Sequence, residues 1–440
     1  MMLASADASG RILIWNIKSG EVKASFQEGS KPILQMEWLG EAIEDTGHML
    51  LALHPSNQLV LWDTSSGKQI WKKTYFNEIL RSFSFDPFDV SRIAFKTSDC
   101  ILFINDFHPS KTPNNIGKKL YVSGPISSIR QSPSRQSFDQ DEMKTSKTKL
   151  KKFMKDFVMS PVSSNNEEAV AAMQDCLQII FHQNARNHII LVYPREVLLL
   201  DLDIGQTVGM IILDRSCSPI LELVPCRLRD GFYILLENGS VSLRLRKELY
   251  RVASTPMVMS RSVSTNSVTA ANAEAEIFNS VTEIQYEQKA ISESLRLSKH
   301  AKTLTTCINP RTETTLAILA SDGKVIMVDA NIQKKKTSKP PYALDDCVPP
   351  TQSMNTKDLN VKLSLTGIMS NLCNPPFVLR MCPPLTTKNW PEYKPLMASG
   401  GSNGNIQIVD MSLGTVEREF ATHTFPVRIY STNYFYKVHL

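Results

Sequence analysis

Residues 400–404 read Gly-Gly-Ser-Asn-Gly and match Gly-x-Ser-x-Gly, the pattern around the nucleophilic serine of many hydrolases. That serine needs a sharp turn between a strand and a helix, which exposes its hydroxyl for attack. Here the glycines lead instead into residues 405–410, where apolar and polar residues alternate as in a strand. We therefore interpret Ser402 as a turn residue of a β-hairpin and assign it no catalytic role.

Other residue types that support catalysis or metal binding also lack the required spacing. His182 and His188 stand six residues apart with Cys176 nearby, whereas zinc sites usually contain closer pairs such as Cys-x-x-Cys or His-x-x-x-His, which this sequence lacks. Asp345 and Asp346 lie in a polar loop, and no glycine-rich loop ends in Gly-Lys-Ser/Thr. We expect no enzymatic activity, metal, cofactor or small-molecule substrate.

A basic tract within residues 144–158 is the strongest candidate for an interaction segment. Its apolar residues recur at helical spacing of three and four, so a short basic amphipathic helix could form on an anionic membrane or in a partner's groove. The alternative is a solvated loop. The residues that would make contact are Lys144, Lys147, Lys149, Lys151, Lys152, Phe153, Lys155 and Phe157.

Three serines in polar segments are candidates for phosphorylation. Ser132 and Ser160 each precede a proline and flank the basic tract, and Ser264 lies in a later serine-rich segment. A phosphate close to the lysines would cancel part of their charge. Such dipeptides also occur by chance in serine-rich loops.

Composition limits the classes of partner and compartment. The chain has 440 residues, 49 Lys and Arg against 43 Asp and Glu, and a formal charge of +6, which gives nucleic-acid binding little support. The N-terminal residues do not resemble a signal peptide, and no uncharged apolar run approaches the roughly 18 residues of a membrane helix. Eight cysteines without Cys-x-x-Cys indicate reduced thiols. We expect a cytoplasmic protein.

Seven segments share one hairpin pattern: an apolar strand, a tight polar turn, and an alternating strand that usually ends in Asp or Asn. The turn residues, such as Ser9-Gly10, Ser56-Asn57 and Asp322-Gly323, tolerate the positive φ angles of hairpin turns. The hairpins span residues 3–16, 50–63, 92–106, 188–201, 232–245, 316–329 and 396–410.

Three polar insertions interrupt the repeat, at about residues 107–175, 249–292 and 331–360. Without them the period is about 42 residues, the length of a four-stranded propeller blade. We therefore predict an all-β propeller of about seven degenerate four-stranded blades, with the insertions largely disordered. Residues 274–298 fit either a helix or strands, and we favour an outer strand near 293–298 in the fifth blade.

We expect a single propeller over residues 1–440, and two hypotheses remain open for whether its ring of blades is closed. The first hairpin lacks a preceding innermost strand, while residues 427–430 form a spare one. Pairing of that strand with residues 2–6 would close the ring and remove two exposed edges. The alternative is a fragment, incomplete at both ends.

Trp15-Asn16 and Trp62-Asp63 stand where WD-repeat proteins carry Trp-Asp, so the chain resembles a WD-repeat propeller. The resemblance implies that these residues, the acids Asp201, Asp329 and Asp410, and the histidines His300 and His423 occupy structural positions that hold a blade together. Most repeats lack the full set. Leu245, for example, stands in place of the acid.

Four longer strings narrow the resemblance: IWKKTY (70–75), SFDPFD (84–89), VYPREVLLLDLD (192–203) and DGFYILLENG (230–239). They are similar to a family of large, non-catalytic WD-repeat scaffolds. The resemblance implies protein partners in vesicle trafficking and tethering, and a location at the trans-Golgi network or on vesicles. The alternatives are binding to anionic membranes through the basic tract, or a nuclear propeller associated with chromatin or RNA.

Overall fold

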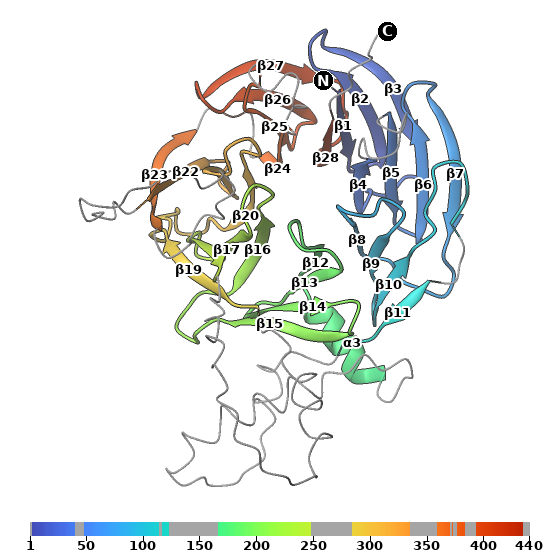
Figure 1. Ribbon diagram of the computed structural model, residues 1–440. Helices are drawn as coiled ribbons and strands as arrows, with labels where there is room; N and C mark the ends of the chain where they lie inside the picture. The colour runs from blue at the N-terminus through green and yellow to red at the C-terminus, as the bar shows by residue number, and fades with distance from the viewer. Residues whose placement is uncertain are drawn as a thin grey trace, which may run out of the picture.

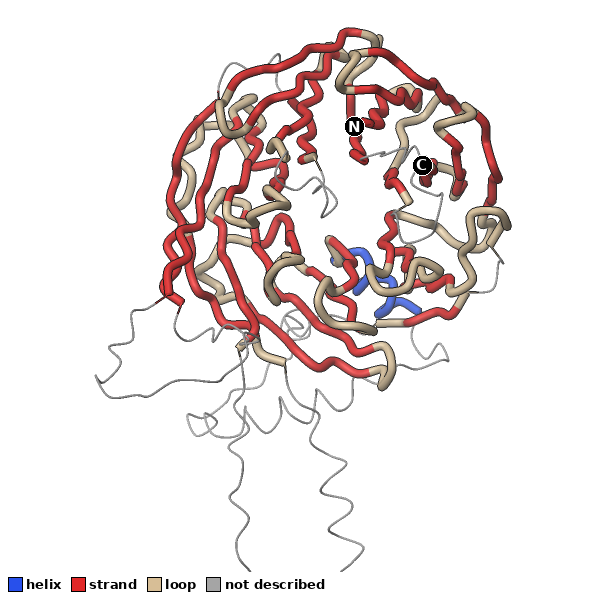
Figure 2. The backbone as a smooth tube through the Cα atoms, turned by 45° about the horizontal axis from the view of Figure 1, so that its top comes forward, coloured by secondary structure: helices blue, strands red, loops and turns tan. Residues whose placement is uncertain are grey.

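A computed structural model describes residues 2–39, 48–113, 117–122, 166–247, 284–334, 359–369, 372, 376–382 and 393–433. These residues form seven four-stranded antiparallel sheets, arranged as blades around a common axis (Figure 1). The predicted all-β propeller with seven blades is confirmed. Figure 2 shows that strands make up nearly the whole ring. No helix in the described part of the chain is long and apolar enough to cross a membrane.

The first four blades, each given from its innermost to its outermost strand, are as follows. Blade 1 contains β28 (Val427–Asn433), β1 (Met2–Asp7), β2 (Arg11–Asn16) and β3 (Glu21–Gln27). Blade 2 contains β4 (Gln35–Trp38), β5 (Met49–His54), β6 (Gln58–Asp63) and β7 (Lys68–Thr74). Blade 3 contains β8 (Ser82–Phe85), β9 (Ile93–Lys96), β10 (Ile101–Ile104) and β11 (Lys118–Leu120). Blade 4 follows helix α3 (Asn166–Asp175) and contains β12 (Gln178–Phe181), β13 (His188–Val192), β14 (Glu196–Asp201) and β15 (Gln206–Ile212).

The remaining three blades follow the same order. Blade 5 contains β16 (Ile220–Pro225), β17 (Gly231–Leu236), β18 (Val241–Arg246) and β19 (Tyr286–Ile291). Blade 6 contains β20 (Thr303–Ile308), β21 (Thr315–Ala320), β22 (Val325–Lys334) and β23 (Leu359–Met369). Blade 7 contains β24 (Pro376–Met381), β25 (Leu396–Gly401), β26 (Asn405–Asp410) and β27 (Thr415–Ala421).

The seven predicted hairpins are the two middle strands of the blades. Their turns use left-handed backbone where the sequence indicated it: Ser56 and Asn57 have φ angles of 61° and 57°, and Gly10 has 82°. A side chain at Gly10 would also collide with the backbone carbonyl of Lys31. Glycine is therefore required there both by conformation and by space.

Blade 1 is completed by the two ends of the described chain. β28 pairs antiparallel with β1, in a register that joins Met2 to Asn433 and Ala6 to Ile429, and the two strands lie side by side in Figure 1. The hypothesis that residues 427–430 pair with residues 2–6 is confirmed. The innermost strand of this blade therefore comes from the opposite end of the chain.

Apolar clusters lie between adjacent blades. Between blades 1 and 7, for example, Trp15 packs with Ile408 and Phe420, and between blades 3 and 4 Met173 of α3 packs with Phe181. Polar side chains add bonds near the axis, each from one innermost strand to a backbone N–H of the next. The donor–acceptor pairs are Phe83 N to Gln35 Oε1 (2.8 Å), Phe181 N to Ser84 Oγ (3.3 Å), Leu223 N to Gln178 Oε1 (2.7 Å) and Thr306 N to Glu222 Oε2 (2.8 Å).

The predicted insertions were too wide, because each contains regular structure at an end. The first contains β11 and α3, the second contains β19, and the third overlaps the ends of β22 and β23. The outer strand predicted near 293–298 is also wrong, since β19 (Tyr286–Ile291) fills that place. The outermost strands β11 and β19 bury few of their side chains, so their sequences carry little apolar alternation.

Candidate interaction surfaces and the networks beneath them

Trp15 and His423 meet in a buried hydrogen-bond network that crosses blade 1. Trp15 Nε1 donates to Ser5 Oγ at 2.8 Å, and Ser5 Oγ lies 2.8 Å from His423 Nε2. His423 Nδ1 lies 2.9 Å from Asp7 Oδ2. The network links β2, β1 and the segment before β28, and the Trp15 ring stacks on Phe420 at 4.9 Å. It therefore fastens the closing strand to the rest of the blade.

The direction of the hydrogen bonds in this network depends on whether His423 is neutral. Burial lowers the pKa of His423, although its hydrogen bond to Asp7 opposes this. The Nδ1–H then donates to Asp7, and Nε2 accepts from the Ser5 hydroxyl. Burial also opposes ionisation of Asp7, but hydrogen bonds from Ser9 and His423 outweigh it and lower the pKa of Asp7. Each polar group in the network thus has a partner of the opposite kind.

Four of the Asp and Asn residues named from the sequence perform a different task, since they close the turn into the outermost strand. In each, one side-chain oxygen accepts backbone N–H bonds two and three residues later, as in a capped turn. Each is also followed four residues later by a glycine with a φ angle of 67° to 79°. The pairs are Asn16 with Gly20, Asp63 with Gly67, Asp201 with Gly205, and Asp410 with Gly414.

Asp63 is the most strongly engaged of these acids. Partial burial raises its pKa, but hydrogen bonds from Ser65 and Ser66 outweigh this and lower the pKa of Asp63 to about 2. The Ser65 hydroxyl lies 2.6 Å from Oδ1 and the Ser66 hydroxyl 2.6 Å from Oδ2. The ionised carboxylate therefore stabilises the turn.

Asp329 closes no turn. The residue four positions later is Gln333 rather than glycine, and β22 continues to Lys334, paired with β23 along its length. Asp329 instead pairs across the sheet with Thr315 and Ser364, and its Oδ1 has no hydrogen-bond partner among the described residues. Blade 6 therefore ends in a two-stranded ribbon that extends past β21.

His300 and Trp62 also differ from the blade 1 arrangement. His300 is exposed, because the positions matching Ser5, Asp7 and Trp15 in blade 6 are Ile318, Ala320 and Val328, which offer it no polar partner. In blade 2 Trp62 is buried and stacks on Phe26 at 4.7 Å. Its Nε1 has no partner in the described structure, since Ala52 replaces the serine hydroxyl.

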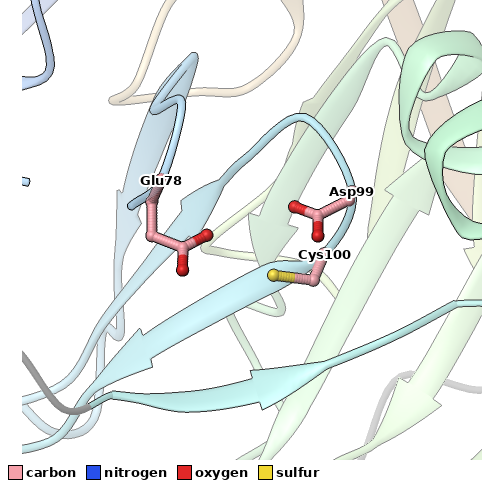
Figure 3. Close-up of side chains that lie close together, drawn as sticks. All are labelled: Glu78, Asp99 and Cys100. Carbon is pink, nitrogen blue, oxygen red and sulfur yellow. The ribbon is translucent and has the colours of Figure 1, made fainter. Parts of the chain in front are cut away.

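Glu78, Asp99 and Cys100 form a cluster at the turn of blade 3 whose ligand atoms lie within 4.8 Å of one another (Figure 3). Its charge is already balanced in part, because Lys119 forms an ion pair with Glu78. Thr97 Oγ1 lies 3.0 Å from Asp99 Oδ1 and 3.3 Å from Cys100 Sγ. Burial raises the pKa of Cys100 to about 11, so its thiol stays protonated, whereas metal ligation needs a thiolate. We assign no metal to this cluster.

The other residues considered for chemistry form separate interactions, although the ring centroids of His182 and His188 lie 6.4 Å apart. His182 contacts Tyr286 Oη at 2.5 Å, while Cys176 donates to the backbone carbonyl of Gln178. His188 faces Asp201 at 3.8 Å. Ser402 lies in the turn between β25 and β26, with no helix after it. The chemistry that these spacings suggested is therefore not assembled.

Large apolar side chains are exposed mainly at one end of the blades, where each outermost strand connects to the next innermost strand. We call this end the crossover face. Its exposed apolar residues are Leu34, Phe76, Ile79, Leu177, Ile212, Ile291, Leu304 and Phe425. Phe76 is the most extreme, with 89% of its surface exposed. The opposite face carries fewer such residues: Phe88, Ile204, Leu228 and Leu413.

A cleft of about 920 Å³ lies between blade 5 and the ribbon of blade 6, and we call it the ribbon cleft. Blade 5 contributes Leu228, Arg229, Asp230, Leu245 and Arg246 to its walls. Blade 6 contributes Thr314, Thr315, Asp329, Ala330, Asn331, Ile332, Leu359, Ser364 and Thr366. The sequence analysis missed this cleft, because its walls come from segments far apart in the chain.

The basic tract at residues 144–158 and the serines Ser132, Ser160 and Ser264 lie outside the described residues. Asp345 and Asp346 also lie outside them. The predictions made for these residues therefore stay predictions.

A ring of seven four-stranded blades, with a Trp-Ser-His-Asp network across one of them, defines a WD-repeat β-propeller. A family described as the WDR11 first beta-propeller matches residues 1–105 and 127–337. The chain is 33% identical over 463 residues to WD repeat-containing protein 11 of Mus musculus, covering 97% of this chain and 36% of the relative. The Danio rerio protein of the same name is 35% identical over 464 residues, covering 97% and 35%.

The chain therefore belongs to the WDR11 first β-propeller family, and it spans about a third of the length of these relatives. Among solved structures, the Cps50 (Swd1) β-propeller domain of Myceliophteria thermophila superposes with a TM-score of 0.51 at 11% identity. That match covers 96% of this chain and 94% of the other, and it shows a shared fold only.

Proposed function

We propose that this propeller is a non-enzymatic scaffold for protein–protein interaction in intracellular vesicle trafficking. Its partners would be other proteins of a tethering complex in the cytoplasm, at the trans-Golgi network or on vesicles. Kinship with WD repeat-containing protein 11 supports the scaffold role. The trafficking role and the location rest on the resemblance described for the sequence.

The crossover face is the observation that carries the proposal. Exposed apolar side chains that gather on one face of a protein commonly mark a site of protein contact. Phe76 and Ile79 lie in one connection of this face, between β7 and β8, and are 89% and 48% exposed. Aromatic side chains in such positions often supply much of the binding energy of an interface.

The test compares the tagged chain with the double variant Phe76→Ser/Ile79→Ser in affinity capture from cells, followed by mass spectrometry. We expect the wild-type chain to recover vesicle-tethering proteins and the double variant to lose them. Leu413→Ser is the matched control, because Leu413 is 72% exposed on the opposite face. Equal recovery by all three chains would exclude the crossover face, and recovery of chaperones alone would contradict the scaffold role.

A second candidate function is binding to anionic membrane surfaces through residues 144–158, which the pattern of lysines and phenylalanines in the sequence favours. Changing Lys149, Lys151, Lys152 and Lys155 to Glu should abolish co-flotation with phosphatidylserine vesicles, and added salt should weaken it in the wild type. Unchanged flotation would reject this function. For a nuclear role on chromatin or RNA, the net charge of +6 is the sole support.

A further inference from the structure

The ribbon cleft runs along a strand edge that has no backbone partner in the described structure. β21 pairs with β22 from Val325 to Asp329, and the last bond on this side runs from Ala330 N to Thr314 O at 2.6 Å. Backbone groups alternate between the two edges of a strand, so the N–H and C=O of Ile332 point to the same edge as those of Ala330. Among the described residues nothing pairs with Ile332 on that edge.

Glu313 explains why the edge is left open. It adopts a φ angle of 52°, which turns the chain out of the sheet just before β21. Its carboxylate accepts hydrogen bonds from the backbone N–H groups of Arg227 and Leu228 in blade 5, and Tyr233 Oη donates to its carbonyl at 2.7 Å. The chain before β21 is thus held against blade 5 and cannot continue along β22.

The cleft passes around this open edge. Ala330 and Ile332 pack toward blade 5 with Leu245 and Val361. Asp329 and Asn331 alternate to the other face of the ribbon, yet they line the same cleft. A cleft bounded by both faces of a strand must run past its edge, and an added strand would occupy that place.

The charges of the cleft favour a basic ligand. Arg246 is paired with Asp230 at 3.1 Å, and Arg229 donates to Thr312 O at 3.0 Å and faces Glu313 at 3.8 Å. No ion pair is found for Asp329 among the described residues, and its Oδ1 lacks a donor. Leaving a buried carboxylate oxygen without a donor is unfavourable, and a bound cation would relieve it. Leu228, also in the wall of the cleft, exposes 55% of its surface.

We propose that the ribbon cleft binds an extended segment of a partner protein, which adds a short strand to the edge of β22. One apolar side chain of that segment packs against Leu228 and Ile332, and one Lys or Arg side chain lies beside Asp329. Strand addition of this kind obtains affinity from main-chain bonds and specificity from alternate side chains. The site builds on the proposed scaffold role but lies apart from the crossover face.

The experiment selects binders for the immobilised 440-residue chain from a random dodecapeptide display library, and measures the Kd of a selected peptide by fluorescence anisotropy. We expect alternating apolar residues and a Lys or Arg among the selected sequences. Asp329→Asn and Leu228→Ser should each weaken binding about tenfold or more, as should N-methylation of one central peptide nitrogen. Leu413→Ser is the control, and thermal melting establishes that each variant is folded.

Three results would overturn the proposal. The library yields no binder to the folded chain, the selected peptides bind Asp329→Asn and Leu228→Ser as tightly as wild type, or N-methylation at every position leaves Kd unchanged. Replacing the basic residue of the peptide with Gln should also remove the effect of Asp329→Asn, because the two charges act as a pair. These outcomes are independent of the crossover face, which the capture experiment tests with different variants.

Discussion

Blades 1 and 6 begin from the same hairpin pattern and end differently. Blade 1 carries polar groups at three buried positions, Ser5, Asp7 and Trp15, which connect to His423, and it ends at the turn closed by Asn16 and Gly20. Blade 6 carries apolar residues at the matching positions, and its strands run on past Asp329. The blade with the Trp-Ser-His-Asp network ends at its turn, whereas the blade without that network extends past the turn position and forms a cleft.

The difference shows that the acid at the end of the third strand is insufficient by itself to end a blade. The turn also needs a residue four positions later that adopts a positive φ angle, and glycine does so at little cost. Gln333 stands there in blade 6. A residue that carries a structural role in four blades is therefore free to serve as a ligand in another.

Among the variants that compare the two blades, Trp15→Ala should cause the largest loss of stability. The Trp15 side chain is 1% exposed, stacks on Phe420 and donates to Ser5, so its loss leaves a cavity and removes one of the two hydrogen bonds of the Ser5 hydroxyl. We expect a loss of about 3–5 kcal/mol in the free energy of unfolding, measured in urea. His300→Ala, at the exposed histidine of blade 6, should change it by less than about 0.5 kcal/mol. Similar losses for both variants would remove the distinction between the blades.

The next largest losses of stability are expected in a double-mutant cycle at Ser5 and His423. Each single change to Ala leaves buried polar partners unsatisfied and should cost about 1–3 kcal/mol. Because both belong to one network, the double variant should lose about 1 kcal/mol less than the sum. In blade 6 the exposed pair Ser298 and Asp322, whose side chains lie 2.9 Å apart, should show coupling of less than about 0.5 kcal/mol. Strict additivity at Ser5 and His423 would mean that their bonds act separately.

Gly67→Ala tests the turn that blade 6 lacks. Gly67 has a φ angle of 71°, and no atom lies within 4 Å of the place its side chain would take, so the substitution isolates the backbone cost. That cost is about 1–2 kcal/mol, seen as a lower midpoint in thermal or urea unfolding. Gln333→Gly, at the matching position of blade 6, should cost less than about 1 kcal/mol, because that residue lies in a strand. If Gly67→Ala is neutral, glycine is not what ends the blade.

The sequence predicted the middle strands well because both of their faces meet neighbouring blades, which enforces apolar residues and a tight turn. The outer strands β11 and β19 were placed inside insertions, because only Leu120 of β11 and no residue of β19 is buried, and their polar pattern resembles a loop. Ser5 and Asp7 were not named as site residues, although a serine and an acid on the strand before the turn of a Trp-containing hairpin were a usable signal. The absence of a glycine four residues after Asp329 was a second usable signal, since it indicates that β22 does not end in a turn there. The ribbon cleft had no local signal, since residues 228–246 and 314–366 meet only in the folded ring.

The pH dependence of stability should show the smallest difference between blades 1 and 6, and it reports on one residue, His423. Burial lowers the pKa of His423 below its ordinary value of 6.5, so the unfolded chain takes up a proton near pH 6.5 that the folded blade 1 resists. Stability contributed by the neutral His423 is therefore complete above pH 6.5 and is lost as pH falls below it. The pKa of His54 in blade 2 shifts in the same direction through burial. The stability contributed by the turn acid Asp63 is complete above pH 3.8 and is lost only as pH falls from 3.8 toward about 2, so it does not change over the range tested.

Between pH 7.5 and pH 5 we therefore expect the wild type to lose stability and His423→Gln to lose less over the same range, with the remaining slope due in part to His54. The measurement is urea unfolding at each pH. His300→Gln is the matched control, and its slope should equal that of the wild type, since the exposed ring has no buried partner in blade 6. A slope unchanged by His423→Gln would mean that folding does not alter the pKa of His423. A steeper loss in His423→Gln than in the wild type would mean that the histidine is charged in the folded chain, with its Nε2 donating to Ser5.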